Sequence, residues 1–278
     1  TLRGQGGSPS ATIAGRGIVA ASYSSREPLG GDLAKLQVVQ PMLMAHATAY
    51  GGALRVTTTV DFEAWTIPDG ELTIAAWGEG FVDRRHPHTV LHELMVSGVG
   101  SLAGAEFSLS GGKGFAAFGS DDPANRLTLR YPVNHHWSQI LERAVLTGGI
   151  LAGPVMAEVS LFNGDEPEYP QENPNFSRFG DSWSARITAL PVRGLQVEAS
   201  YASVQSPEHR AGAGTDQDKW HASAQWTRPL GGHPFYAMAE WAETVEGDGL
   251  FVFDSFLAEA AWDLGATRLY YQFERTER

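Results

Sequence analysis

The clearest pattern in the chain is a strict alternation of apolar and polar residues in the segment 219–226. Its polar face carries lysine, histidine, serine and glutamine, and its apolar face reads Trp220, Ala222, Ala224 and Trp226. A period of two residues is typical of a β-strand. The same spacing, with aromatic or large apolar ends, recurs in Phe235-Ala237-Ala239-Trp241, Phe256-Ala258-Ala260-Trp262 and Leu195-Val197-Ala199-Tyr201. Aromatic rings at both ends of successive strands indicate strands that cross a bilayer, because such rings prefer the two water–lipid boundaries.

Alternation and turn residues divide most of the chain into strands. We expect strands near 12–24, 34–48, 53–66, 71–80, 104–118, 137–151, 154–163, 182–191, 195–205, 219–229, 234–245, 250–263 and 267–276. Several turns are short, whereas the connections 163–181 and 204–218 are long and polar, and this asymmetry is typical of outer-membrane barrels. The pattern therefore predicts an all-β fold, a single transmembrane antiparallel β-barrel of about 12–14 strands over residues 1–278.

The alternation fails between residues 83 and 100. Positions that share a helical spacing there are His88, Leu91, His92, Leu94 and Met95. This spacing predicts a short helix that forms a plug inside the barrel or a loop across its mouth. In this position Arg84 and Arg85 would pair with carboxylates of the barrel wall.

Composition agrees with an exported membrane protein and excludes some partners. The formal net charge is −12, which argues against a nucleic acid as partner. No apolar run reaches the length of a membrane-spanning helix, and the mean hydropathy is −0.20, because polar lumen positions dilute the lipid-facing ones. Cysteine is absent, which suits an oxidising periplasm. We therefore expect the protein in the bacterial outer membrane, with the lipid bilayer as its main partner.

Carboxylates recur on the faces opposite the apolar ones. The residues that we expect to line the lumen are Asp61, Glu63, Glu158, Glu198, Glu240 and Glu259. On the lipid side, regular charges of this kind would be costly. Two interpretations remain open: the charges form ion-pair ladders that fill a narrow barrel, or they line a water-filled, cation-favouring channel.

Histidines are the candidate metal ligands. Of the nine histidines in the chain, the five candidates are His86, His88, His92, His135 and His136. His88 and His92 are four residues apart and would share a face of a helix, which suits a divalent transition metal. Two alternatives remain, in both of which the chain has no cofactor: these imidazoles make hydrogen bonds that hold the plug, or they couple gating to protons.

Catalytic patterns are weak. The chain lacks the Gly-x-Ser-x-Gly elbow of serine hydrolases. The nearest approach to a nucleophile–base pair is His221 with Ser223, which are two residues apart and share one face of a strand. Such pairs arise by chance in any barrel that contains histidine and serine, so we expect no enzymatic activity.

A combination of short motifs resembles a known family. The motifs are Asp83-Arg84-Arg85-His86-Pro87-His88, Asn134-His135-His136-Trp137, Gly153-Pro154-Val155, Phe162-Asn163-Gly164-Asp165-Glu166-Pro167 and Asp181-Ser182-Trp183-Ser184-Ala185-Arg186. Together, across residues 13–276, they resemble a group of bacterial outer-membrane, porin-like β-barrels. The resemblance implies an exported barrel and assigns no substrate or catalytic residue. Chains of this group usually end on an aromatic residue, whereas this one ends at Arg278, so either C-terminal strands are missing or the barrel closes differently.

These observations favour one function and leave two others open. The first is a channel or passive transporter for small solutes or ions, with a cation-favouring lumen. The second is a structural or scaffold barrel whose loops bind a partner complex, and the third is an outer-membrane enzyme with an active site at the rim. A protein partner and a homo-oligomer both remain open.

Overall fold

The computed structural model describes residues 8–24, 33–66, 89–120, 135–140 and 142–277. The strands of the N-terminal half are β1 (Ser10–Ser24), β2 (Leu33–Ala49), β3 (Leu54–Asp61), β4 (Leu91–Leu102), β5 (Ala105–Gly114), β6 (Arg143–Ala152) and β7 (Val155–Phe162). Those of the C-terminal half are β8 (Ser182–Val192), β9 (Leu195–Val204), β10 (Gln217–Thr227), β11 (Phe235–Glu246), β12 (Phe251–Leu264) and β13 (Thr267–Glu277). The short helices are α1 (Glu63–Thr66), α2 (His135–Ser138) and the 3-10 turns η1 (Tyr50–Gly52) and η3 (Phe176–Arg178).

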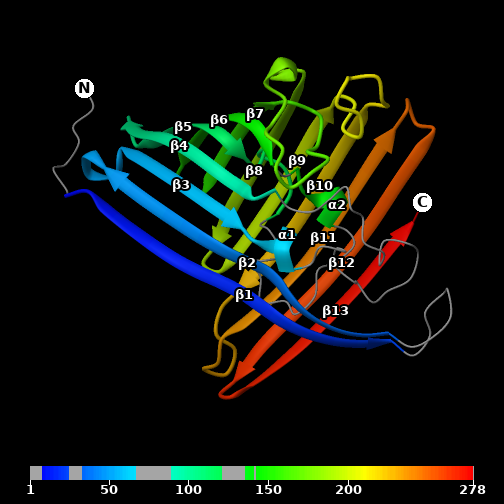
Figure 1. Ribbon diagram of the computed structural model, residues 1–278. Helices are drawn as coiled ribbons and strands as arrows, with labels where there is room; N and C mark the ends of the chain where they lie inside the picture. The colour runs from blue at the N-terminus through cyan, green and yellow to red at the C-terminus, as the bar shows by residue number, and fades with distance from the viewer. Residues whose placement is uncertain (1–7, 25–32, 67–88, 121–134, 141, 278) are drawn as a thin grey trace.

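All strands described belong to one antiparallel sheet. The order of the 13 strands in the sheet is their order in the chain, from β1 to β13. This confirms the predicted all-β fold and strand number. Figure 1 shows how strongly the sheet curls, as expected for a barrel wall, because strands that twist and tilt to the axis curve the sheet. None of the helices in the described part of the chain is long and apolar enough to cross a membrane.

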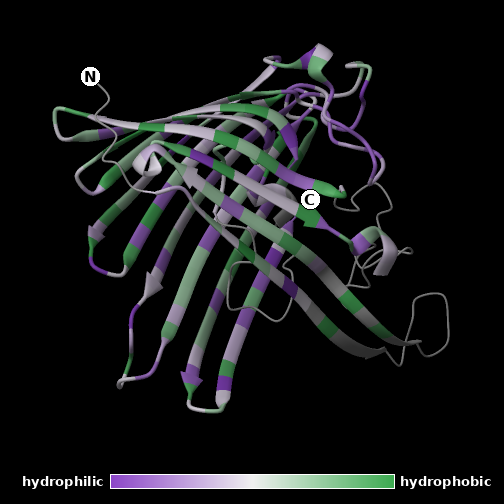
Figure 2. Cartoon of the chain, turned by 60° about the vertical axis from the view of Figure 1, so that its left-hand side comes forward, coloured by the Kyte–Doolittle hydropathy of each residue, from purple (hydrophilic) through white to green (hydrophobic). Residues whose placement is uncertain are grey.

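Side chains alternate between the two faces as the sequence predicts. On β10, Lys219 and His221 are buried on the concave inner face, while Ala222 and Ala224 are exposed on the outer face. Figure 2 shows the same alternation as bands of opposite hydropathy along the strands. The outer face therefore matches lipid and the inner face matches a polar lumen.

Aromatic residues form two belts on the outer face. Near the rim with the long loops, Tyr201 lies between Trp183 and Trp220, with ring centroids 5.3 and 5.4 Å apart. Near the opposite rim, Trp262 pairs in register with Phe235 on the neighbouring strand. The predicted aromatic ends of the strands are therefore grouped at two levels, which is the arrangement of the water–lipid boundaries.

The predicted helix is wrong where the structure describes it. Residues 91–100 belong to strand β4 and not to a helix. A β-bulge places His92 as an extra residue, because Thr59 pairs with Glu93 but Val60 pairs with Leu91. The extra residue shifts the phase of the alternation and produces a false helical spacing. Residues 83–88, including Arg84 and Arg85, and the strand predicted at 71–80 lie outside the described residues.

Candidate functional site

Two segments leave the wall and lie against the inner face of the sheet. The chain turns inward after β5, and residues 115–120 are mostly buried, as are residues 137–140 after the start of α2. The amide of Ala116 donates to the carbonyl of Ile140 at 3.2 Å, which joins the two segments. We call residues 115–120 the inner segment. The sequence gives no sign of it, because Ala116 and Phe118 continue the alternation of β5.

Polar side chains of four strands hold the inner segment. The hydroxyl of Ser160 on β7 accepts the amide of Ala117 at 2.8 Å, and the hydroxyl of Ser200 on β9 accepts the amide of Gly119 at 2.9 Å. Arg186 on β8 donates to the carbonyl of Gly119 at 3.1 Å. The hydroxyl of Ser120 donates to Glu240 on β11. These bonds satisfy backbone groups that would otherwise be buried without partners, and they fix the inner segment across the wall.

Apolar packing completes this docking. The cluster that joins the inner segment to the wall comprises Ala116, Phe118, Ile140, Val145, Phe162, Ala202 and Val204. Trp137 of α2 stacks on Phe253 of β12, with ring centroids 6.2 Å apart. Part of the interior of the sheet is therefore filled by the protein itself.

The predicted lumen carboxylates are on the inner face or buried next to it. Asp61, Glu198, Glu240 and Glu259 are each at most 6% exposed. Glu63 is buried in α1, where its amide donates to Asp61 at 2.8 Å. Glu158 forms an ion pair with Arg186 at 2.7 Å, as in the ladder interpretation.

Three of these carboxylates bond to hydroxyl, amide and imidazole groups. Glu240 accepts from His221 Nε2 at 3.0 Å as well as from Ser120. The remaining bonds, 2.6 to 3.2 Å long, join Glu259 to Tyr236 and Glu198 to Thr188 and Gln196. The inner wall of β9–β12 therefore combines carboxylates with hydroxyl, amide and imidazole donors.

The predicted metal ligands are not brought together among the described residues. His92 is buried on β4, where its Nδ1 bonds to Glu142. Glu142 also accepts the amide of Thr89, at 3.0 and 3.1 Å. The side chains of His86, His88, His135 and His136 lie outside the described residues, and no group of three potential ligands occurs within them. His92 therefore has a local role in holding the start of β4, and the metal site stays a prediction.

The nearest catalytic pair does not form. His221 Nε2 bonds to Glu240, and the hydroxyl of Ser223 is 3.5 Å from Glu198. A hydroxyl must bond to the imidazole to be activated by it. The contacts of His221 and Ser223 therefore give the enzyme interpretation no support.

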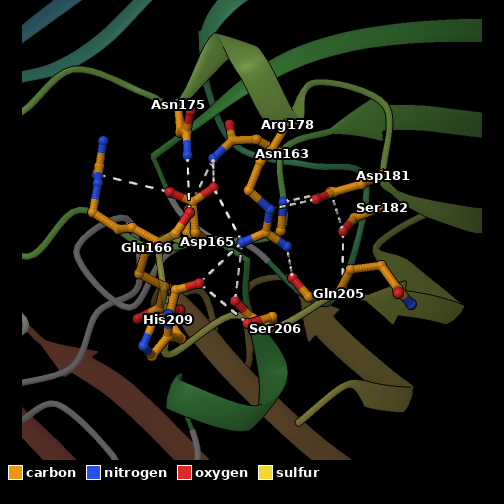
Figure 3. Close-up of polar contacts among 12 residues, drawn as sticks. Asn163, Asp165, Glu166, Asn175, Arg178, Asp181, Ser182, Gln205, Ser206 and His209 are labelled. Atoms are coloured by element: carbon orange, nitrogen blue, oxygen red, sulfur yellow. Dashed lines mark hydrogen bonds and ion pairs between the residues drawn. The ribbon is translucent and has the colours of Figure 1, made fainter. Parts of the chain in front are cut away.

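A polar network ties two long loops together at the rim. Asp165 is buried between Arg178 of its own loop and Arg210 of the loop 205–216, with nitrogen–oxygen distances of 3.6 and 3.8 Å. Arg178 also donates to the carbonyls of Ser206 and His209, both at 3.2 Å. Figure 3 shows Asp165 and Arg178 of the first loop next to Ser206 and His209 of the second. The sequence marked the loops as long and polar but gave no sign of this pairing.

Comparison with solved structures supports the fold. OccK2 (OpdF) of Pseudomonas aeruginosa, solved in complex with glucuronate, is similar with a TM-score of 0.51 at 11% identity, over 96% of this chain and 64% of that chain. A BenF-like porin from Pseudomonas fluorescens has a TM-score of 0.49 at 10% identity, over 96% and 67% of the two chains. An anion-selective porin from Comamonas acidovorans has a TM-score of 0.48 at 10% identity, over 96% and 88%. No family model and no curated protein matches the chain. The fold is that of a bacterial outer-membrane, porin-like β-barrel.

Proposed function

We propose that the protein is a passive channel of the bacterial outer membrane for small solutes or ions. The observation that carries this proposal is the inner segment, which is docked by side chains of β7, β8, β9 and β11 on a polar inner wall. A barrel that only anchors a partner needs no hydrogen-bonded segment folded into its interior. The two aromatic belts on the outer face support insertion in a bilayer.

Conductance tests this proposal directly. The purified protein, inserted in a planar lipid bilayer, should give discrete current steps in potassium chloride. Insertion is confirmed independently by resistance to added protease and by quenching of tryptophan fluorescence with brominated lipids. Inserted protein that passes no current would refute the channel.

A scaffold barrel is the second candidate. It is favoured by apolar residues of the wall that fill part of the interior away from the inner segment, among them Tyr236, Met238 and Leu257, all at most 4% exposed. In that case the loops at the rim would bind a partner complex, and the inserted protein would pass no current. Conductance therefore separates the two candidates.

We also propose that the lumen favours cations, because Glu198, Glu240 and Glu259 line the wall of β9–β12. In water, one unit charge changes the energy of an ion about 8 Å away by about 0.5 kcal/mol. This changes the permeability of that ion roughly twofold. Each carboxylate acts on cations and on anions in opposite directions, so Glu198→Gln combined with Glu259→Gln should reduce the cation-to-anion permeability ratio by roughly sixteenfold.

Reversal potentials under a salt gradient measure this ratio. The matched control is Glu243→Gln, which removes the same charge from the outer face of β11, where Glu243 pairs in register with Trp220. The control should leave the ratio unchanged. A native channel that prefers anions would contradict the proposal.

A further inference from the structure

The loop that joins β7 and β8 crosses the rim to a distant strand. We call residues 163–181 the strap and residues 205–216 the brace. The carbonyl of Pro170, in the middle of the strap, accepts the amide of Val90 at the start of β4 at 2.8 Å. Three strand spacings separate β4 from β7 in the sheet, which is about 14 Å. The strap therefore spans this part of the rim instead of pointing away from it.

One ion pair places the strap over the inside of the sheet. Arg143 is on the inner face of β6, only 3% exposed, and its Nη2 is 2.8 Å from Glu166 Oε1 of the strap. Lys219, buried on the inner face of β10, also interacts electrostatically with Glu166. Because both cations belong to the inner wall, the bond draws the beginning of the strap over the lumen and not over the lipid-facing side.

The strap and the brace form one unit. Besides its contact with Asp165, Arg210 of the brace bonds to Glu172 at 3.0 Å and to the carbonyl of Asn173 at 3.3 Å. Asn175 returns a bond to the carbonyl of Arg210 at 3.1 Å. The amide of Glu166 donates to Pro207 of the brace at 3.0 Å. These bonds connect successive parts of the strap to the brace.

The contacts at the base of the strap are more buried than the ion pair that ties the beginning of the strap to β6. At the base, Asp165 is fully buried, and Asp181 holds both the amide of Gly164 and the guanidinium of Arg178, at 2.8 and 2.7 Å. Next to this base, Glu166 is 32% exposed, so water reaches its ion pair with Arg143. Ion pairs open to water are weak and are screened by salt. The Glu166–Arg143 pair is therefore among the contacts that release first.

From this arrangement we infer that the strap is a gate at the loop-side mouth of the barrel. In the closed state, Pro170 is latched to Val90 and Glu166 to Arg143. In the open state these two contacts are broken, while Arg178 and Arg210 keep the strap joined to the brace. The unit then moves away from β4 about its base at β7–β9. This inference rests on the proposed channel function.

A reversible covalent latch tests the gate. The chain has no cysteine, so Val90→Cys combined with Pro170→Cys introduces one unambiguous pair. Oxidation should form the disulfide and lower the open fraction of the channel in a planar bilayer, and a reductant should restore it. Each single-cysteine variant serves as a redox control. A second control is Leu102→Cys with Ala105→Cys, a directly paired position at the opposite rim that should cross-link without effect.

The outcomes separate the gate from the channel. If the reduced double variant is inserted but passes no current, the proposed channel function fails. If it conducts and the oxidised form conducts equally, the gate is refuted and the channel stands. If the disulfide does not form while the control pair does, the strap is not latched at β4, which also refutes the gate.

Weakening the ionic latch should have the opposite effect. Glu166→Gln should raise the ratio of open to closed states by up to about fivefold, the range of a partly exposed ion pair. Glu168→Gln removes the same charge from an exposed position on the strap and should leave the ratio unchanged. High salt should raise the ratio in the native protein and have less effect on Glu166→Gln. An unchanged ratio in Glu166→Gln contradicts the electrostatic latch.

Discussion

Replacing Gly119 by alanine is expected to displace the inner segment and increase the conductance of the channel. Gly119 has a φ of +70°, and an added Cβ would lie 1.5 Å from the carbonyl oxygen of Ser138. That oxygen is backbone, so residues 115–120 and 135–140 must move apart. The expected loss of unfolding free energy is about 1–2 kcal/mol from the left-handed backbone and about 1–3 kcal/mol from the clash.

Gly265→Ala is the matched control. Gly265 has a φ of +69°, and no atom lies within 4 Å of an added Cβ. The control therefore has the same backbone strain without the clash. Single-channel recording should show larger current steps for Gly119→Ala than for Gly265→Ala. Equal steps in the two variants would mean that the inner segment does not limit the flow of ions.

Replacing Ala224 by arginine is expected to destabilise the barrel by about 2–4 kcal/mol, because Ala224 is exposed on the outer face between the two aromatic belts. A guanidinium at this depth must be taken into hydrocarbon, whereas the same group near a boundary reaches water. Chemical unfolding in lipid vesicles, followed by tryptophan fluorescence, measures the change in free energy.

Two controls separate the effect of depth in the bilayer from the effect of side-chain size. Val192→Arg places the charge on the outer face at the end of β8, where Val192 is 54% exposed and pairs in register with Leu195. This substitution should lower the free energy of unfolding by only about 0–1 kcal/mol. Ala224→Leu adds bulk without charge and should leave the stability nearly unchanged. If Ala224→Arg and Val192→Arg cost the same, the outer face of β10 is not in lipid.

The strands of the C-terminal half were predictable because their signal is local. On β10, the alternation that begins at Lys219 and ends at Trp226 already separates the inner face from the outer one. The paired register adds neighbours but does not change which way a side chain points. Charges on the inner face, such as Glu240 and Glu259, follow from the same period.

The predicted elements that differ from the structure also have local causes. At β4, the extra residue His92 interrupts the period, and Met95 is an apolar residue that points inward, where it packs against the cluster of the inner segment. After β5, the predicted strand 104–118 ends at Gly114 and the chain turns inward. The predicted strand 137–151 begins at Arg143, because the residues before it lie against the wall. Apolar alternation cannot tell a residue in the wall from one packed against its inner face.

Sequence by itself determined the strand-rich fold, the lipid-facing surface and the inward direction of the carboxylates, since each depends on a two-residue period within one strand. Tertiary structure alone decided which charges meet. Asp165 and Arg210 are far apart in the chain and come from different loops, and Arg143 meets Glu166 only where the strap crosses the rim. Such pairs depend on strand register and on the curvature of the sheet, which bring distant residues together. Neither register nor curvature produces a periodic pattern of residues in the sequence.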